Sequence, residues 1–400
     1  MSLKNTFNYN QYNIKQIPLL PLVIPLVIYV FSIYFLYLLP FTYTVDTDLI
    51  MLSVVDYLLS ITTVYIFFMV NKYRIFDIDQ CLKVRYLNFI KNNFLFFLIL
   101  VLYSLYATYK NLMLVVLSGY NREGLLNEVS AGYLDMLLPN LFSCMFVVSV
   151  IYKYPFRIKL LFLTGVISVM LFYLSRSNLL FLIFFPIVFL FVFQYKLNYK
   201  KIMKFLLIGF SIVIFASYIT ILQGRAENIQ EVIFKIAETM FRYKAYSFYL
   251  AEYAIEVSSG IEKSLFPFLG WFSEKLIALG WKVDNPISIY GSNFVFKFHF
   301  LGNGYRANVL YPWWSWFYGY YGVLGLLLKA VYTYAILYVT LRFKLSLTFL
   351  FFLYTVLFNI VVKHPFINAA AFYAFAVLII LDILTKVKFG NYFNGKNSIN

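Results

Sequence analysis

Arg176 is the residue with the clearest capacity for chemistry. It lies in a Ser-Arg-Ser-Asn segment between two apolar runs, at 160–174 and 179–193. A guanidinium at the edge of a bilayer is costly unless it binds an anion, and its planar fork matches the oxygens of a phosphate. The other interpretation is a snorkelling or helix-capping arginine. We favour a ligand for a phosphate-bearing molecule.

Three further arginines lie in or at the end of a long segment at 223–310. Arg225 directly follows an apolar run, and Arg306 follows a Gly-Asn-Gly turn and precedes the next run, so both would lie at the mouth of a cavity between spans. An ion pair with nearby glutamates competes with ligand binding at Arg225. At Arg242 the ion pair is favoured, because Glu238 lies one helical turn earlier.

The histidines of the sequence are His299 and His364. Lys363, His364 and Pro365 form a tight turn between the last two apolar runs. A histidine at a membrane surface can act as a general base, so either ring is a candidate. The competing interpretation for each is an ordinary interfacial histidine.

Other chemistries have little support. Asp56 and Asp135 lie inside apolar runs and could form a proton relay in a transporter, but no pattern of basic partners accompanies them. No Walker A, GxGxxG, CxxC or HExxH pattern occurs, which argues against ATP drive, dinucleotide binding and a zinc site. Cys81 and Cys144 are the two cysteines, and a disulfide between them is not expected.

Composition identifies the elements that must position these residues. The 400-residue chain is 62% hydrophobic and only 12% charged, which is the balance of a polytopic membrane protein. Its net charge of +16 would suggest nucleic acid as the partner of a soluble protein. Here much of the Lys and Arg lies in short loops between apolar runs, so positive-inside anchoring explains the charge and nucleic acid is not expected.

The apolar runs predict an all-α fold with about ten transmembrane helices. The predicted spans are 17–39, 49–70, 94–117, 133–152, 158–174, 178–195, 202–222, 311–339, 345–362 and 366–385. Lys110 and Lys329 weaken the third and the eighth span. The first run is too long for a cleavable signal peptide. The loops that follow the second, fourth, sixth and eighth spans are basic, so we expect both termini to be cytoplasmic.

This topology divides the chain into three parts. Residues 1–222 hold spans one to seven, residues 223–310 form a large outer loop, and residues 311–400 hold the last three spans and a cytoplasmic tail. Within the loop, 226–257 reads as an amphipathic helix, which would lie on the membrane or cap the bundle. An aromatic stretch at 265–281 follows, and then a stretch at 289–300 that alternates as a strand does.

In order along the chain, these features resemble a known family. They are the Ser-Arg-Ser segment that opens a mid-chain span, the large late outer loop, Asn308-x-Leu310, and Tyr-Gly-Val-Leu-Gly at 321–325 in the next span. The layout is similar to that of the bacterial O-antigen polymerases, integral-membrane enzymes grouped with the GT-C glycosyltransferases. The resemblance covers about residue 160 to the C-terminus and depends on layout more than on sequence words.

The resemblance implies an activity and a location. Such enzymes join undecaprenyl-diphosphate-linked glycans at the periplasmic face of the bacterial inner membrane, transferring the growing chain to a new repeat unit. Ligases with a similar layout have a histidine where this chain has Ala307, which favours a polymerase. Membrane lipids and a chain-length-regulating co-polymerase are the implied partners, and catalysis would need neither metal nor cofactor.

The resemblance also assigns roles to residues. Arg176 would be the span-opening arginine, and Arg225 and Arg306 would bind diphosphate. His364 or His299 would act as the base. Arg242, Asn308 and Lys363 complete the set of candidate substrate-binding residues.

Two other functions stay open. A polysaccharide flippase would usually have more spans and shorter loops. An ion-coupled transporter would use Asp56 and Asp135, but no inverted repeat is visible.

Overall fold

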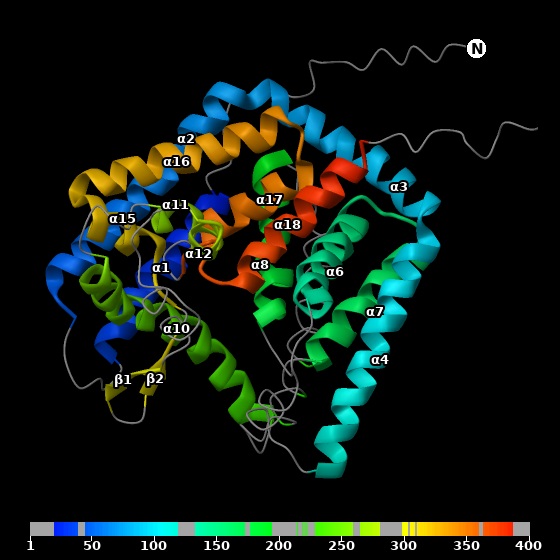
Figure 1. The fold of residues 1–400 in the computed structure, drawn as a ribbon, viewed down its shortest axis with the longest axis horizontal. Helices are drawn as coiled ribbons and strands as arrows, with labels where there is room; N and C mark the ends of the chain where they lie inside the picture. Colours follow the sequence, from blue (N-terminus) through cyan, green and yellow to red (C-terminus); the bar gives the residue numbers. More distant parts are fainter. Residues whose placement is uncertain are drawn as a thin grey trace, which may run out of the picture.

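The protein is described from a computed structural model. It describes residues 20–38, 45–118, 133–172, 177–193, 229–258, 265–280, 298–302, 305–308, 310–359 and 363–386, and the single helical positions 214, 218 and 221. These parts of the chain are mostly helical (Figure 1).

Most predicted spans coincide with helices. The helices are α1 (Leu20–Leu38), α2 (Thr47–Gln80), α4 (Phe94–Ser118), α6 (Tyr133–Ile151), α7 (Phe156–Phe172), α8 (Ser177–Phe193), α16 (Val323–Arg342), α17 (Ser346–Tyr354) with its continuation η4 (Thr355–Asn359), and α18 (Ala369–Leu384). Within the described residues, four stretches are long and apolar enough to cross a membrane: Thr47–Asn71, Phe94–Leu114, Leu134–Ile151 and Val323–Arg342. The expectation of a helical, membrane-embedded protein is confirmed. The predicted span at 202–222 lies largely outside the described residues, and the count of ten stays a prediction.

The predicted span at 311–339 is wrong as a single helix. The chain forms α15 (Trp313–Tyr321), turns at Gly322 with φ of +59°, and continues as α16. A side chain at that φ would be strained, which favours glycine. α15 folds back on α16, and a Cβ on Gly325 would lie only 2.1 Å from the Phe317 carbonyl oxygen. The membrane-crossing part is therefore α16, whose 20 residues cover about 30 Å.

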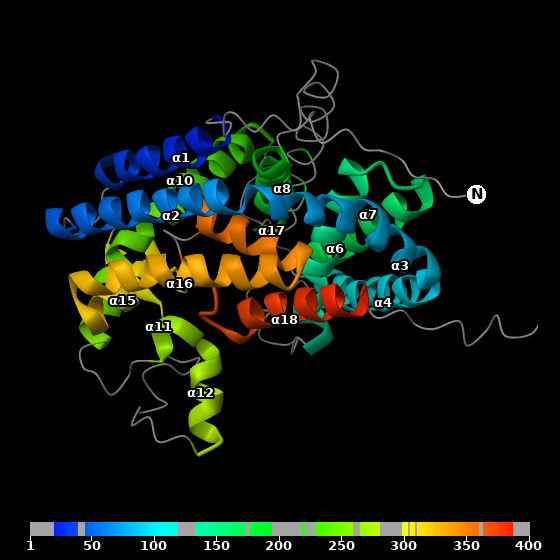
Figure 2. The ribbon, with the colours of Figure 1, turned by 90° about the horizontal axis from the view of Figure 1, so that it is seen from above.

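α2 and α16 lie side by side through the bundle (Figures 1 and 2). A buried ion pair joins them. Lys329 Nζ lies 2.5 Å from Asp56 Oδ1 and 2.6 Å from Oδ2, and it donates to Ser60 Oγ at 3.1 Å. Both charged side chains are 1% exposed. No basic partner for Asp56 is evident from the sequence, and in the structure Lys329 provides one from a helix that is distant in the chain.

The first turn of α17 is capped by a residue of α18. Asp382 Oδ1 accepts from Leu347 N at 3.1 Å, and Oδ2 accepts from Thr348 N at 2.9 Å and Thr348 Oγ1 at 2.8 Å. Tyr86 Oη donates to Oδ1 at 2.6 Å. A carboxylate satisfies the free N–H groups at a helix start and interacts favourably with the helix dipole. Asp382 therefore links three separate elements.

The basic segment after α2 is helical rather than a loop. α2 continues to Gln80 and is followed by the π-helical η2 (Cys81–Arg85) and by α3 (Tyr86–Asn92). Tyr86 and Ile90 of α3 are buried. The segment therefore packs against the bundle while its lysines and arginines provide positive charge at the predicted cytoplasmic side.

The described parts of the segment between α8 and α16 contain helices and two strands. α10 (Ile229–Val257) is one continuous helix and confirms the predicted helix at 226–257. α11 (Phe266–Leu269), α12 (Trp271–Ala278) and the antiparallel strands β1 (His299–Gly302) and β2 (Tyr305–Ala307) follow it. Strand β1 begins at the end of the stretch that alternates in the sequence.

α10 caps the bundle instead of lying apart from it. It packs against α1 and α15, and its second half is buried on several faces. Phe241 stacks on Phe35 of α1 with ring centroids 5.2 Å apart. At the other end of the segment, Phe272 of α12 stacks on Phe372 in the first turn of α18, with 5.0 Å between centroids. Phe266, Phe268 and Trp271 of the same stretch also contact aromatic rings of α15 or α18.

Candidate functional site

The three arginines expected to bind diphosphate are not brought together by the described parts of the structure. Arg176 and Arg225 lie outside the described residues, although α8 begins at Ser177, directly after Arg176. The backbone of Arg306 lies in β2, paired with Phe300 of β1, and its side chain lies outside the description. Arg242 is half-buried on α10 and makes a contact. Convergence of the arginines stays a prediction.

His364 lies at a junction of three elements. Its backbone N–H donates to the Tyr311 carbonyl at 2.9 Å, and its Nδ1 accepts from Phe366 N at 2.9 Å. Its Nε2 lies 3.1 Å from the Phe266 carbonyl and 3.0 Å from that of Pro267. Since carbonyls only accept, Nε2 carries the proton.

The same junction includes Trp313. Its Nε1 donates to the Pro267 carbonyl at 2.7 Å. His364 and Trp313 therefore both bind carbonyl groups of α11 and fix its position. The centroid of the Trp313 ring lies 5.7 Å from that of the His364 ring and 5.6 Å from Lys329 Nζ. The intramembrane ion pair is thereby connected to the segment predicted to lie outside.

The geometry corrects the role proposed for His364. The ring is fully buried, and this burial lowers its pKa to about 3, although the two carbonyls partly oppose the shift. A general base needs a free lone pair that faces the substrate. The lone pair of Nδ1 is already used by Phe366 N. His364 therefore orients the junction rather than accepting a proton.

Stability should fall as the pH drops below 6.5 because of His364. The ring stays neutral in the folded protein down to about 3, whereas the unfolded ring binds a proton below its ordinary pKa of 6.5. Unfolding therefore takes up a proton between those values, and stability decreases by up to about 1.4 kcal/mol per pH unit. The measurement is denaturation at pH 4, 5, 6 and 7 for the wild type and for His364→Gln, which cannot titrate. Parallel curves for the two proteins would contradict the assignment.

His299 remains the candidate base. Its ring lies on Tyr253 of α10 with centroids 4.1 Å apart, and it meets the Tyr311 ring edge-on at 6.2 Å. The flanking Phe298 and Phe300 point the other way and are 54% and 70% exposed. Strand alternation thus turns the histidine toward the helices and the two phenylalanines outward.

Asn308 and Lys363 flank this region. Asn308 is half-buried directly after β2 and makes a contact. Lys363 N donates to the carbonyl of Asn359, the last residue of η4, at 3.0 Å, and this bond connects the turn to η4. Desolvation lowers the pKa of the Lys363 amine. Both residues lie beside elements of the junction, and their role as substrate ligands stays a prediction.

Lys244 is a charged residue that sequence reasoning missed. Its Nζ donates to the Phe358 carbonyl of η4 at 2.7 Å, and desolvation lowers its pKa to about 8. The sequence contains a signal for it. The apolar stripe of α10 runs through Ile236 and Met240, and its next position is Lys244. A lysine on an apolar stripe is buried with its helix face, which separates it from the solvated lysines of the loops.

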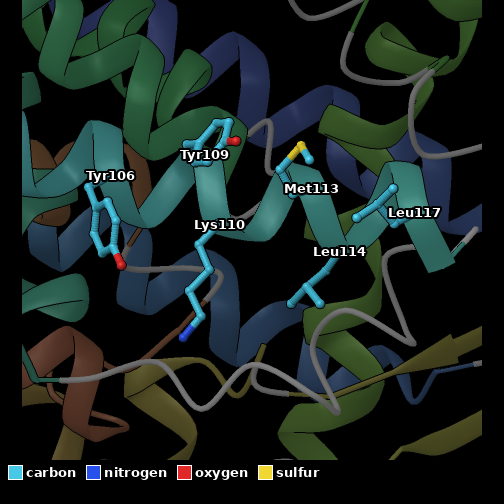
Figure 3. A pocket seen from close by; sticks show the side chains of 6 residues that line it. All are labelled: Tyr106, Tyr109, Lys110, Met113, Leu114 and Leu117. Carbon is cyan, nitrogen blue, oxygen red and sulfur yellow. The ribbon is translucent and has the colours of Figure 1, made fainter.

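An open pocket on the surface of α4 is not part of this site. It measures about 340 Å³ and is lined by six side chains of α4 (Figure 3), namely Tyr106, Tyr109, Lys110, Met113, Leu114 and Leu117. Both tyrosines are largely exposed on a helix apolar enough to cross a membrane, so this face suits contact with lipid. Lys110 can then reach the headgroups with its long side chain.

Two further observations complete the description. Within the described ranges, no group of three or more His, Cys, Asp or Glu side chains could hold a metal ion, and Cys81 and Cys144 are buried free thiols. Comparison of the chain with models of protein families, with curated proteins and with solved structures gave no match.

Proposed function

We propose that the protein is a glycosyltransferase of the O-antigen polymerase type. It extends a glycan carried on undecaprenyl diphosphate at the periplasmic face of the inner membrane, with both termini cytoplasmic. The growing chain is the donor, and a hydroxyl group of a new lipid-linked repeat unit is the acceptor. A co-polymerase that sets chain length is the expected partner.

One observation carries the proposal. The described elements from α10 to β2 are rich in aromatic residues, and they pack on α1, on α15 and on the first turn of α18. A flippase with short loops has no such assembly. Exposed aromatic rings such as Phe298 and Phe300 offer apolar faces on which sugar rings can stack.

Positively charged side chains can support the proposed reaction without a metal ion. The acceptor oxygen forms a bond to the anomeric carbon of the donor as the bond from that carbon to the diphosphate oxygen breaks. Arg176, Arg225 and Arg306 stabilise the charge that develops on the leaving diphosphate. His299 takes the proton of the acceptor hydroxyl, since the Nδ1 lone pair of His364 already accepts from Phe366 N.

Replacing Arg176 tests the proposal. Arg176→Ala should abolish long O-chains, and Arg176→Lys should retain only part of the activity, because lysine lacks the bidentate fork. Laddering of lipopolysaccharide on gels measures both variants. Arg342→Ala is the matched control, since Arg342 is the exposed last residue of α16 and has no part in the proposed site. Long chains in both Arg176 variants would refute the role.

A transporter remains the alternative function, and the Asp56–Lys329 pair is the observation that favours it. Ionisable residues inside a bilayer often mark transport pathways. Here the two charges satisfy each other and pack between α2 and α16, which favours a structural role. Deletion of the gene separates the functions. Loss of a polymerase leaves lipopolysaccharide with a single repeat unit, whereas loss of a flippase leaves none.

A further inference from the structure

Lys244 lies where a π-helical turn meets α10. The residues of η4 follow α17 directly and end its regular hydrogen bonding. Phe358 belongs to this turn, and its carbonyl accepts from Lys244 Nζ at 2.7 Å. Single π-helical turns occur often at functional sites, because they redirect a backbone group at little cost to the helix.

The surroundings of the amine are aromatic. The Phe358 ring stacks on Phe184 of α8 at 4.8 Å with an angle of 13° between the planes, and it lies 5.8 Å from the Tyr354 ring. Phe241, one turn before Lys244 on α10, stacks on α1. Such walls supply few acceptors, so two of the three ammonium donors lack a protein acceptor among the described residues.

The position of Phe184 relates Lys244 to the proposed active site. Phe184 lies seven residues after Ser177, which begins α8 directly behind Arg176. At 1.5 Å per residue this is about 10 Å along the helix axis. The η4 residue that binds Lys244 thus packs on α8 about two turns after the first residue of that helix, Ser177.

We propose that Lys244 binds a phosphate group, namely that of the lipid-linked diphosphate substrate. The inference rests on the proposed function for the identity of this ligand. The phosphate oxygens accept from the two ammonium N–H groups for which no acceptor is found among the described residues, while the Phe358 carbonyl orients the third. The lowered pKa of the lysine is consistent with a site that is short of negative charge until the ligand arrives.

A binding experiment on the full chain tests this. The protein is placed in nanodiscs of zwitterionic lipid, and its affinities for undecaprenyl diphosphate and for undecaprenol are measured. Lys244→Met should weaken the binding of the diphosphate about tenfold or more and leave undecaprenol unchanged, and Lys244→Arg should retain most of the affinity. Lys275→Met is the control, since Lys275 is exposed over the Trp271 ring. Unchanged diphosphate affinity in Lys244→Met would overturn the proposal and leave a lysine that only caps a helix.

A second measurement guards against a variant that does not fold. In the wild type, acetylation of Lys244 is followed by mass spectrometry. Undecaprenyl diphosphate should slow it at least fivefold and leave Lys275 unaffected, whereas equal rates with and without the ligand would overturn the proposal. Nanodiscs with an anionic phospholipid form a further arm. Protection by this lipid alone would overturn the assignment to the substrate and identify a headgroup site.

The outcomes also separate this inference from the proposed function. Loss of long O-chains in Arg176→Ala with normal diphosphate binding in Lys244→Met would retain the polymerase and reject the lysine site. Diphosphate binding that depends on Lys244, in a protein whose deletion leaves O-chain length unchanged, would retain the site and reject the polymerase.

Discussion

Lys329→Met is expected to lower the free energy of unfolding by about 3–5 kcal/mol, because it leaves the Asp56 carboxylate buried without its partner. The loss reflects the desolvated charge more than the attraction within the pair. SDS titration in bicelles, followed by tryptophan fluorescence, measures the change. Trp313 is a suitable reporter, because its ring lies 5.6 Å from Lys329 Nζ.

Two comparisons make the expectation specific. The double variant Asp56→Leu with Lys329→Met should recover most of the loss, since no unpaired charge remains. Lys344→Met removes a second ion pair, with Asp77 at 2.9 Å, whose side chains are about half exposed. That variant should cost less than about 1 kcal/mol. Equal losses for Lys329→Met and Lys344→Met would mean that the buried pair contributes nothing beyond a surface contact.

Asp382→Ala is expected to destabilise the protein by about 3 kcal/mol or more. It removes the acceptor of Tyr86 Oη and of two backbone N–H groups at the start of α17, all of which are buried. Asp382→Asn keeps one acceptor oxygen and should lose less. The same SDS titration measures both variants.

An ordinary helix cap provides the control. Asn368 Oδ1 accepts from Ala371 N at 2.9 Å within its own helix, so Asn368→Ala should cost about 1 kcal/mol. If Asp382→Ala lowered the free energy of unfolding no more than Asn368→Ala, the hydrogen bonds that join α3, α17 and α18 would stabilise the protein no more than an ordinary helix cap.

Local patterns account for what the sequence predicted well. The spans follow from apolar runs, and α10 follows from a stripe with helical spacing, because both depend on neighbours in the chain. Gly322 was missed for the opposite reason. The run at 311–339 is apolar throughout, and only the packing of Phe317 against Gly325 shows that the chain turns there.

Long-range pairing accounts for what could not be predicted. From the sequence, Asp56 has no evident basic partner, and Lys329 is unfavourable in an apolar span. The structure pairs the two side chains, so each neutralises the buried charge of the other. His364 was a candidate base because its turn suggests a surface, and only the contact with α11 shows that it is buried. Neither outcome follows from sequence spacing, since each depends on which helices become neighbours. The roles of Arg176, Arg225 and Arg306 remain predictions because their side chains lie outside the described residues.

The Asp56–Lys329 pair also has a consequence for biosynthesis. Its members lie 273 residues apart in the chain. At ordinary rates of translation, of about 5–20 residues per second, Lys329 is synthesised roughly 14 to 55 s after Asp56. During that interval α2 holds an acidic side chain whose counter-charge does not yet exist. The correct pairing of α2 with α16 is therefore a late event, and a ribosome that stalls before residue 329 leaves an incomplete bundle with an uncompensated acid for quality control to recognise.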